Sequence, residues 1–244
     1  MCFHLAATAK AKTLKARFKA DFPQEEAFVP SEYFNAFAHP LLPVITADNP
    51  QQIDLFNWGL VPYWVKNEDM AKKMMKSTLN ARIETAFEKP SFREPMRYQR
   101  CIIPATSFYE WQHVSSAKIE VKPEVISAQA DLFPQSSDMV KIEAELALDP
   151  QNETDKVKYK ISTDQEVFAF AGIWDSWQDK KGFSILTMPA NPLMEKIHNS
   201  GKRMPFILKP ENEMKWLDPE RQSYDDLKEL ILPYSDELMQ AIRI

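Results

Sequence analysis

Glycine is scarce in this 244-residue chain, which holds only four glycines against an average usage of roughly 7%. The four positions, Gly59, Gly172, Gly182 and Gly201, lie far apart in the sequence. Because dinucleotide-binding and P-loop motifs need several glycines within a few residues, both kinds of phosphate-binding loop are excluded. The G-x-S-x-G motif of serine hydrolases is absent as well. The chain therefore carries none of the short motifs typical of kinases, dehydrogenases or these hydrolases.

Cysteine is rarer still, with Cys2 and Cys101 the two present, and the four histidines are scattered along the chain. Two distant cysteines form no disulfide framework, and neither residue type shows the spacing of a zinc site. Cys101 lies in an apolar strand pattern and is interpreted as a buried core thiol. No apolar run reaches the roughly 18 residues that span a bilayer, and no signal-peptide core is present. We therefore expect a cytoplasmic protein with no membrane association, metal or disulfide.

Negative charge is concentrated in one segment. The formal net charge is -5, and residues 113–157 carry nine acidic residues against four lysines, so the rest of the chain is neutral. This segment is rich in serine, proline and charge and lacks sustained periodicity, which predicts a partly mobile surface insertion. We expect a single domain over residues 1–244 with an acidic insertion at about 113–157. A basic cluster over residues 10–19 leaves a local basic groove possible.

Strand and helix patterns follow one another irregularly along the rest of the chain. Apolar runs punctuated by prolines over residues 40–64, and the runs VKYKIST, VFAFAGIWDSW and FSILTMP, predict strands. Residues 13–20 and 69–76 show helical patterns, and further helices are predicted near 212–217 and 224–230. The stretch NPLMEKIHN predicts a short helix with Asn191 as N-cap and His198 at its end. This irregular order indicates an α+β fold.

Residues 97–111, RYQRCIIPATSFYEW, predict two strand segments joined at Pro104. In the second segment, period-two alternation places Phe108 and Glu110 on one face and Tyr109 and Trp111 on the other. A carboxylate that shares a strand face with phenylalanine is partly desolvated. Glu110 is therefore either half of a structural ion pair or a catalytic acid.

Cys2 has a chemistry that no internal cysteine offers. Once Met1 is removed, Cys2 carries a free amine beside its thiol, and such a 1,2-aminothiol attacks an aldehyde with nitrogen and closes a ring with sulfur. An α-amine has a pKa of roughly 7.7 to 8.0, so part of it is neutral at physiological pH and needs no strong base. A cysteine at this position is, by itself, no evidence for that reaction.

Six blocks, in order, cover nearly the whole chain outside the insertion. They are MC at the start, WGLVPYW (58–64), NARIET (80–85), RCIIPATSFYEW (100–111), FAFAGIWDSW (168–177), and the IH and RMP of IHNSGKRMPFIL (197–208). Together these blocks resemble the SRAP family, the SOS response-associated peptidases that cap abasic sites in DNA. The resemblance implies an α+β fold of strongly curved, mixed and mainly antiparallel, barrel-like sheets with peripheral helices.

The resemblance also implies a reaction and its residues. Cys2 would form a thiazolidine with the ring-opened aldehyde of an abasic deoxyribose in single-stranded DNA, with lyase activity and self-reversal as further possibilities. Asn80 would orient Cys2 or the sugar, Glu110 would act as general acid and base, and His198 would assist opening of the sugar ring. The alternatives from the residues alone are that Asn80 caps a turn and that His198 satisfies a last-turn carbonyl.

The same resemblance implies a DNA-binding surface. Arg82 and Arg203 would hold phosphates, and Trp58 and Trp64 would supply stacking surfaces, although both arginines are also interpretable as surface charges and both tryptophans as core. His4 stands where the family usually has a phosphate-binding arginine and would contact phosphate only weakly. We therefore predict weaker DNA binding than in family members with that arginine.

Two other classes of function remain open at this point. One is a peptidase with an N-terminal cysteine nucleophile, and the other is a non-catalytic module that binds single-stranded DNA. In the favoured interpretation the partner is single-stranded DNA with abasic sites, no small-molecule cofactor or metal is needed, and the protein is a monomer.

Overall fold

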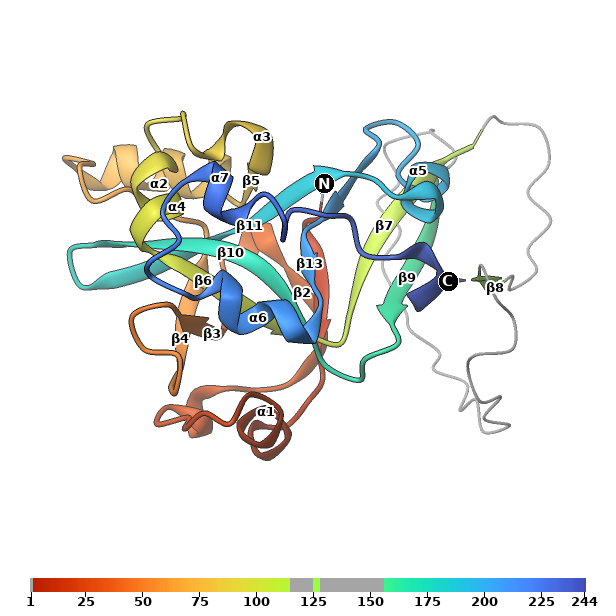
Figure 1. Ribbon diagram of the computed structural model, residues 1–244, viewed down its shortest axis with the longest axis horizontal. Helices are drawn as coiled ribbons and strands as arrows, with labels where there is room; N and C mark the ends of the chain where they lie inside the picture. The colour runs from red at the N-terminus through yellow and green to blue at the C-terminus, as the bar shows by residue number, and fades with distance from the viewer. Residues whose placement is uncertain (1, 115–124, 128–155) are drawn as a thin grey trace.

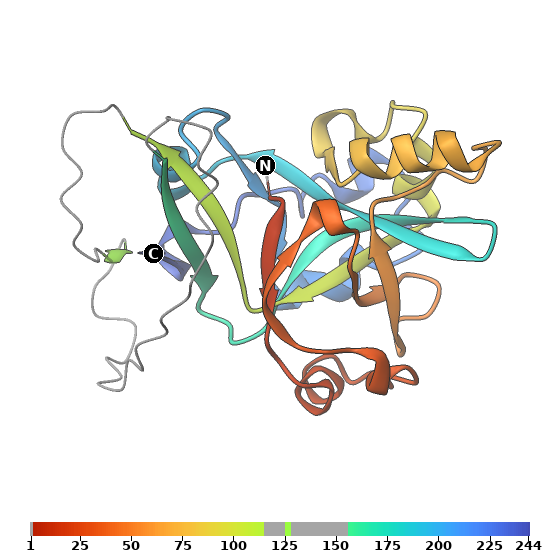
Figure 2. The same cartoon turned by 180° about the vertical axis from the view of Figure 1, so that it is seen from behind.

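The computed structural model describes residues 2–114, 125–127 and 156–244 of the chain (Figure 1). The acidic insertion predicted at about 113–157 falls almost entirely outside these residues. The described residues form two sheets with helices on their outer sides (Figures 1 and 2).

The first sheet has six strands in the order β2-β1-β7-β9-β14-β8. All of its pairings are antiparallel. Its strands are β1 (His4–Ala7), β2 (Ser31–Asn35), β7 (Ser107–His113), β8 (Val125–Ser127), β9 (Lys156–Thr163) and β14 (Met239–Arg243).

The second sheet closes on itself. Its order is β12-β11-β4-β3-β6-β10-β13, and an additional pairing of β11 with β10 joins five of these strands, β11, β4, β3, β6 and β10, into a ring. Strand β11 runs parallel to β4 and β5, and the other pairings are antiparallel. Its strands are β3 (Leu41–Thr46), β4 (Ile53–Trp58), β5 (Asn80–Arg82), β6 (Arg100–Ala105), β10 (Phe168–Trp177), β11 (Lys180–Pro189), β12 (Arg203–Pro205) and β13 (Ile207–Leu208). The predicted α+β fold with mixed, barrel-like sheets is confirmed.

The helices are short and lie around the sheets (Figures 1 and 2). They are α1 (Ala11–Phe18), α2 (Glu68–Ser77), α3 (Ile83–Ala86), α4 (Arg93–Tyr98), α5 (Pro192–Ile197), α6 (Pro210–Trp216) and α7 (Tyr224–Leu227), with 3-10 turns η1 (Glu25–Ala27), η2 (Ala36–Ala38) and η3 (Asp236–Leu238). Helix α5 starts as predicted, since the Asn191 side chain accepts a hydrogen bond from the Met194 N–H and Pro192 occupies the first turn.

One predicted boundary is wrong. Pro104 does not separate two strands, because it lies inside β6 and pairs with Ala169 of β10, and the break falls at Thr106 instead. A proline fits here because β3 pairs with β6 only at Cys101 and Ile102, so the ladder on that side has already ended. The first segment also starts later than predicted, at Arg100, because the preceding residues form α4.

Candidate active site

Cys2 lies just before β1, where the two sheets meet. In Figure 1 the N-terminus lies between β5 and β11 on one side and β7 and α5 on the other. The Cys2 carbonyl oxygen accepts a hydrogen bond of 2.8 Å from Asn80 Nδ2. Asn80 opens β5, which belongs to the barrel through its pairing with Ile185 of β11, whereas β1 belongs to the other sheet. This one bond therefore connects the Cys2 end to the barrel.

The Cys2 thiol is fully buried and lies close to a negative charge. Its Sγ–H donates to the His4 carbonyl oxygen at 3.6 Å, and the side chain is 0% exposed. Burial, followed by the negative charge of Glu110, raises the pKa of the thiol well above its usual range. The thiol is therefore protonated at neutral pH.

Glu110 and His198 face one another beside Cys2. Glu110 shares the inner face of β7 with Phe108, as the alternation predicts, and both side chains are buried. Glu110 Oε2 lies 4.0 Å from His198 Nε2. Burial raises the pKa of Glu110, and a hydrogen bond from the backbone N–H of Trp111 opposes that shift. This carboxyl is thus suited to exchange a proton nearer to neutral pH than an exposed glutamate would be.

The protonation state of His198 follows from its neighbours. His198 Nδ1 accepts a hydrogen bond of 3.1 Å from the backbone N–H of Arg203, so the proton of the neutral ring sits on Nε2, the atom that faces Glu110. Burial lowers the pKa of His198 to about 4. At neutral pH the ring is therefore uncharged and presents an N–H donor toward the carboxylate.

Two side chains form hydrogen bonds between the residues around His198 and β7, the strand that carries Glu110. The Asn199 carboxamide donates to the His113 carbonyl oxygen at 2.8 Å and accepts from the His113 N–H at 3.0 Å. One turn earlier, Gln112 Nε2 donates to the Lys196 carbonyl oxygen at 2.9 Å. These bonds hold the end of α5 against the end of β7, and they account for the short distance between the two candidate catalytic groups.

Sequence reasoning missed Asn199 and Gly201. Gly201 lies against the imidazole: a Cβ atom there would come within 2.5 Å of His198 Cε1. Both residues lie in the stretch NSGK between His198 and Arg203, and no pattern in that stretch predicts that either one supports the imidazole.

The two tryptophans predicted to contact DNA lie in different environments. Trp58 is 0% exposed, its Nε1–H donates to the Leu79 carbonyl oxygen at 2.9 Å, and its ring stacks on Phe183. No nucleobase can reach that ring, so the predicted DNA contact of Trp58 is replaced by the core alternative. Trp64 is 38% exposed and adjoins Tyr63, which is 64% exposed. Of the two, Trp64 alone keeps a surface for stacking.

The two arginines also differ. Arg203 makes a bidentate ion pair with Glu84, at 2.7 and 2.9 Å, and also donates to the Thr187 carbonyl oxygen at 2.6 Å. These partners occupy the guanidinium that we expected to hold a phosphate. Arg82 is exposed at the end of β5 and remains accessible to an anion.

His4 packs on the opposite side of β1 from this site. Its ring stacks on Tyr33, with centroids 5.1 Å apart, and meets the edge of Trp111 at 4.8 Å. Burial lowers the pKa of His4 to about 4, and the charge of Lys158 adds to that shift. A neutral His4 has no charge to offer a phosphate, in keeping with the weak contact predicted for it.

The described residues contain no group of three histidine, cysteine, aspartate or glutamate side chains placed to bind a metal ion. Within the same residues, no helix combines the length and apolar character that crossing a membrane requires.

Comparison with known proteins places this arrangement in a family. The sequence model of SOS response associated peptidase (SRAP) matches residues 1–244. The chain is 33% identical to the abasic site processing protein YoqW of Bacillus subtilis, over 100% of this chain and 92% of that protein. It is also 33% identical to the abasic site processing protein HMCES of Mus musculus, over 77% of this chain and 51% of the mouse protein.

A solved structure agrees with these sequence matches. The crystal structure of a protein from Bacteroides thetaiotaomicron is similar to this fold with a TM-score of 0.80 and 34% identity, over 100% of this chain and 92% of that one. The family match over every residue and the relatives above 30% identity together show that the chain belongs to the SRAP family.

Proposed function

We propose that the protein processes abasic sites in single-stranded DNA by forming a covalent thiazolidine through Cys2 after Met1 is removed. The observation that carries the proposal is the convergence of four side chains from separate segments. Asn80 holds the Cys2 carbonyl at 2.8 Å, the Glu110 carboxylate lies 4.0 Å from His198, and the charge of Glu110 acts on the Cys2 thiol. The names of the relatives, abasic site processing proteins, support abasic sites as the substrate.

The reaction starts at the sugar. An abasic deoxyribose is mostly a closed hemiacetal, and opening it moves a proton from the C1 hydroxyl to the ring oxygen. The neutral His198 ring donates a hydrogen bond from Nε2 to the ring oxygen, and Glu110 accepts the proton of the hydroxyl and delivers it to the ring oxygen. The product of this step is the free aldehyde.

The amine then reacts before the sulfur. The neutral Cys2 amine adds to the aldehyde carbon, and loss of one water gives an imine, with Glu110 moving the protons. Addition of the Cys2 sulfur to the imine carbon, with transfer of the thiol proton to the imine nitrogen, closes the five-membered ring. The overall change is the joining of protein and DNA with loss of one water. Asn80 Oδ1, which has no hydrogen-bond partner among the described residues, is available to accept from the amine or from a sugar hydroxyl.

The raised pKa of the thiol argues against a peptidase. A thiol peptidase needs a thiolate as its first nucleophile, and cysteines that serve this purpose have a lowered pKa. In the chain that still carries Met1, burial and the charge of Glu110 shift the pKa of Cys2 in the opposite direction. The thiazolidine route needs only a neutral amine for the first attack, so it agrees better with this environment.

Intact-protein mass spectrometry with an abasic single-stranded oligonucleotide tests the proposal. We expect loss of Met1, followed by an adduct equal to the oligonucleotide mass less one water, mapped to Cys2. Cys2→Ser should lose the stable adduct, because oxygen closes the ring far less durably, and the matched control Cys101→Ala should retain it. A stable adduct in Cys2→Ser would contradict the thiazolidine, and wild-type protein without Met1 that forms no adduct would contradict the whole proposal. Strand scission on a denaturing gel and transfer to a second abasic strand would report lyase activity and self-reversal.

A further inference from the structure

One lysine lies among aromatic rings on the outer face of the six-stranded sheet. Lys158 Nζ lies 4.7 Å from the centroid of Tyr109, 4.8 Å from that of Tyr33 and 5.6 Å from that of Trp111. The His4 ring stacks on Tyr33 and meets Trp111 edge-on. These five residues come from four neighbouring strands, β2, β1, β7 and β9, and we call them the Lys158 cluster.

The charge of Lys158 is not neutralised within the described part of the chain, where no carboxylate lies within ion-pair distance of it. Lys160, two residues further along β9, offers the contrast, because its Nζ is 2.8 Å from Glu32 Oε2. Aromatic faces attract an ammonium group electrostatically, but they do not accept conventional hydrogen bonds from its N–H groups as a carboxylate does. These donors therefore stay available to an anion. Desolvation lowers the pKa of Lys158. The rings therefore disfavour the charged ammonium relative to water, and a bound anion would stabilise that charge.

The Lys158 cluster is close to the candidate active site along two strands. His4 is two residues from Cys2, and its carbonyl oxygen accepts the Cys2 thiol. Trp111 follows Glu110 directly on β7 and pairs with Lys158 across the ladder. Because side chains alternate along a strand, Glu110 faces inward while Trp111 and Lys158 face outward near the same end of the sheet. In addition, His4 Nδ1 has no hydrogen-bond partner among the described residues.

We propose that Lys158 binds a backbone phosphate of the DNA strand whose abasic site reacts with Cys2, and that the rings of Tyr33 and Trp111 contact the adjoining nucleotide. The inference rests on the proposed function. A strand whose abasic residue lies at Cys2 extends beyond it in both directions, and Lys158 is a cation close to this site with no anionic partner among the described residues. Lysine binds phosphate as a point charge, and stacking on aromatic side chains is the usual companion of such contacts to single strands. Lys158 would thus supply the positive charge that His4 does not.

The salt dependence of binding tests this proposal directly. The probe is a single-stranded oligonucleotide with a tetrahydrofuran abasic analogue, which has no aldehyde and therefore reports binding without crosslinking. For single strands, log K falls with log[salt] by about 0.7 for each phosphate that is neutralised. We expect Lys158→Gln to make the slope shallower by about 0.7 and to weaken binding at low salt, and Lys158→Arg to keep the wild-type slope.

A matched control exists on the same face. The double variant Glu32→Gln with Lys160→Gln removes a neutral ion pair next to the cluster and should leave the slope unchanged. A Lys158→Gln protein that melts as the wild type does but keeps the wild-type slope would overturn the inference while leaving the proposed function intact. If the wild type binds neither the analogue nor a true abasic strand, the proposed function fails, and this inference fails with it.

Discussion

The environment of His198 shows how single residues decide the chemistry of the site. The Arg203 N–H fixes which ring nitrogen carries the proton, and burial keeps the ring neutral. Gly201 leaves room for the ring where any side chain would collide with it. A histidine acts as donor to a substrate oxygen only when its proton is on the nitrogen that faces the site, and here the loop after the helix imposes that arrangement.

Gly201→Ala should therefore slow crosslinking. The new Cβ would lie 2.5 Å from His198 Cε1, so the ring must move away from its place opposite Glu110, and displacements of about 1 Å in an active site slow a reaction by roughly 10- to 100-fold. The rate of adduct formation with an abasic strand measures the effect, and Ser200→Ala, an exposed neighbour, should react at the wild-type rate. A Gly201→Ala rate within twofold of wild type would show that the ring tolerates the methyl group.

At the scale of secondary-structure elements, Arg100 joins two helices that are distant in the sequence. Its guanidinium donates to the carbonyl oxygens of Met96 and Arg97 at the end of α4, and of Trp216 and Asp218 at the end of α6. The side chain is 1% exposed. The last carbonyls of a helix have no partner within it and carry partial negative charge, so one buried cation stabilises both ends.

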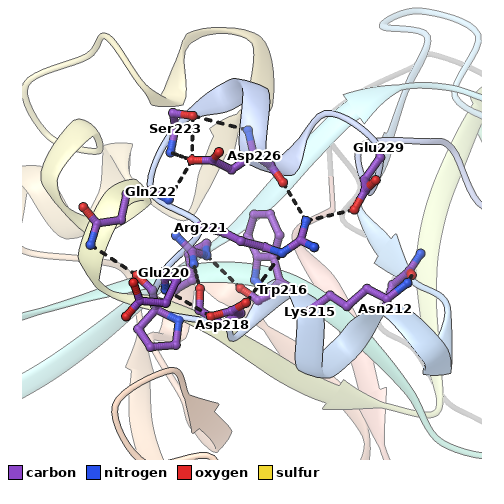
Figure 3. Close-up of polar contacts among 12 residues, drawn as sticks. Asn212, Lys215, Trp216, Asp218, Glu220, Arg221, Gln222, Ser223, Asp226 and Glu229 are labelled. Carbon is purple, nitrogen blue, oxygen red and sulfur yellow. Dashed lines mark hydrogen bonds and ion pairs between the residues drawn. The ribbon is translucent and has the colours of Figure 1, made fainter.

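Hydrogen bonds among exposed side chains fix the conformation of the segment that follows α6. Figure 3 shows Arg221 donating to the Asp226 carbonyl oxygen and to Glu229, and the capping box between Ser223 and Asp226 that starts α7. On the buried side, Arg100 donates to the carbonyl oxygens of Trp216, the last residue of α6, and of Asp218, which lies in this segment. This segment is therefore held on its buried side by Arg100 of the barrel strand β6 and on its exposed side by the hydrogen bonds of Arg221.

Replacing Arg100 should be strongly destabilising. Arg100→Met leaves several buried carbonyls without partners, and each costs roughly 1–3 kcal/mol, so we expect the free energy of unfolding to fall by about 2–4 kcal/mol after relaxation. Urea denaturation measures it. Arg97→Met, on the exposed side of α4, should change stability by less than about 0.5 kcal/mol. A loss below about 1 kcal/mol in Arg100→Met would mean that water replaces the arginine at these carbonyls.

At the scale of the whole molecule, two pairs of buried titratable groups change stability in opposite directions as pH changes. His4 and His198 both have folded-state pKa values of about 4, below the ordinary 6.5, so the unfolded chain binds protons that the folded protein does not between about pH 6.5 and 4. Stability contributed by these residues is therefore lost as pH falls through that window. Glu110 and Glu213 have raised pKa values and act in the opposite direction, because their contribution is lost as pH rises through the folded-state pKa.

A variant isolates one of these contributions. His4→Phe keeps an aromatic ring beside Tyr33 and Trp111 but cannot titrate, so its free energy of unfolding should fall less than that of wild type between pH 7.5 and 5.0, by at most about 2 kcal/mol. Urea denaturation at both pH values gives the difference. His113→Gln, at an exposed position, should show the wild-type difference. Equal pH dependence of His4→Phe and wild type would contradict this account.

Sequence reasoning was accurate where the cause is local. The N-cap of α5 and the inward face shared by Phe108 and Glu110 follow from capping and periodicity. It failed at Pro104, because a proline is compatible with a strand when the neighbouring ladder has ended, and a single sequence does not reveal its neighbours. It also left Trp58 undecided, because an aromatic residue in a motif packs in a core as readily as it meets a ligand.

By itself, the sequence determined the α+β class, the short elements and the set of chemically capable residues, because these depend on side-chain type and spacing over a few positions. Only the tertiary structure decided which of those residues act together. The bond from Asn80 to Cys2 spans 78 positions and the approach of His198 to Glu110 spans 88, and such pairs exist only once the barrel and the second sheet have closed against each other. Arg203 and Lys158 show the same dependence: a nearby Glu84 engages one cation and no carboxylate engages the other among the described residues, because charge pairing depends on neighbours in space.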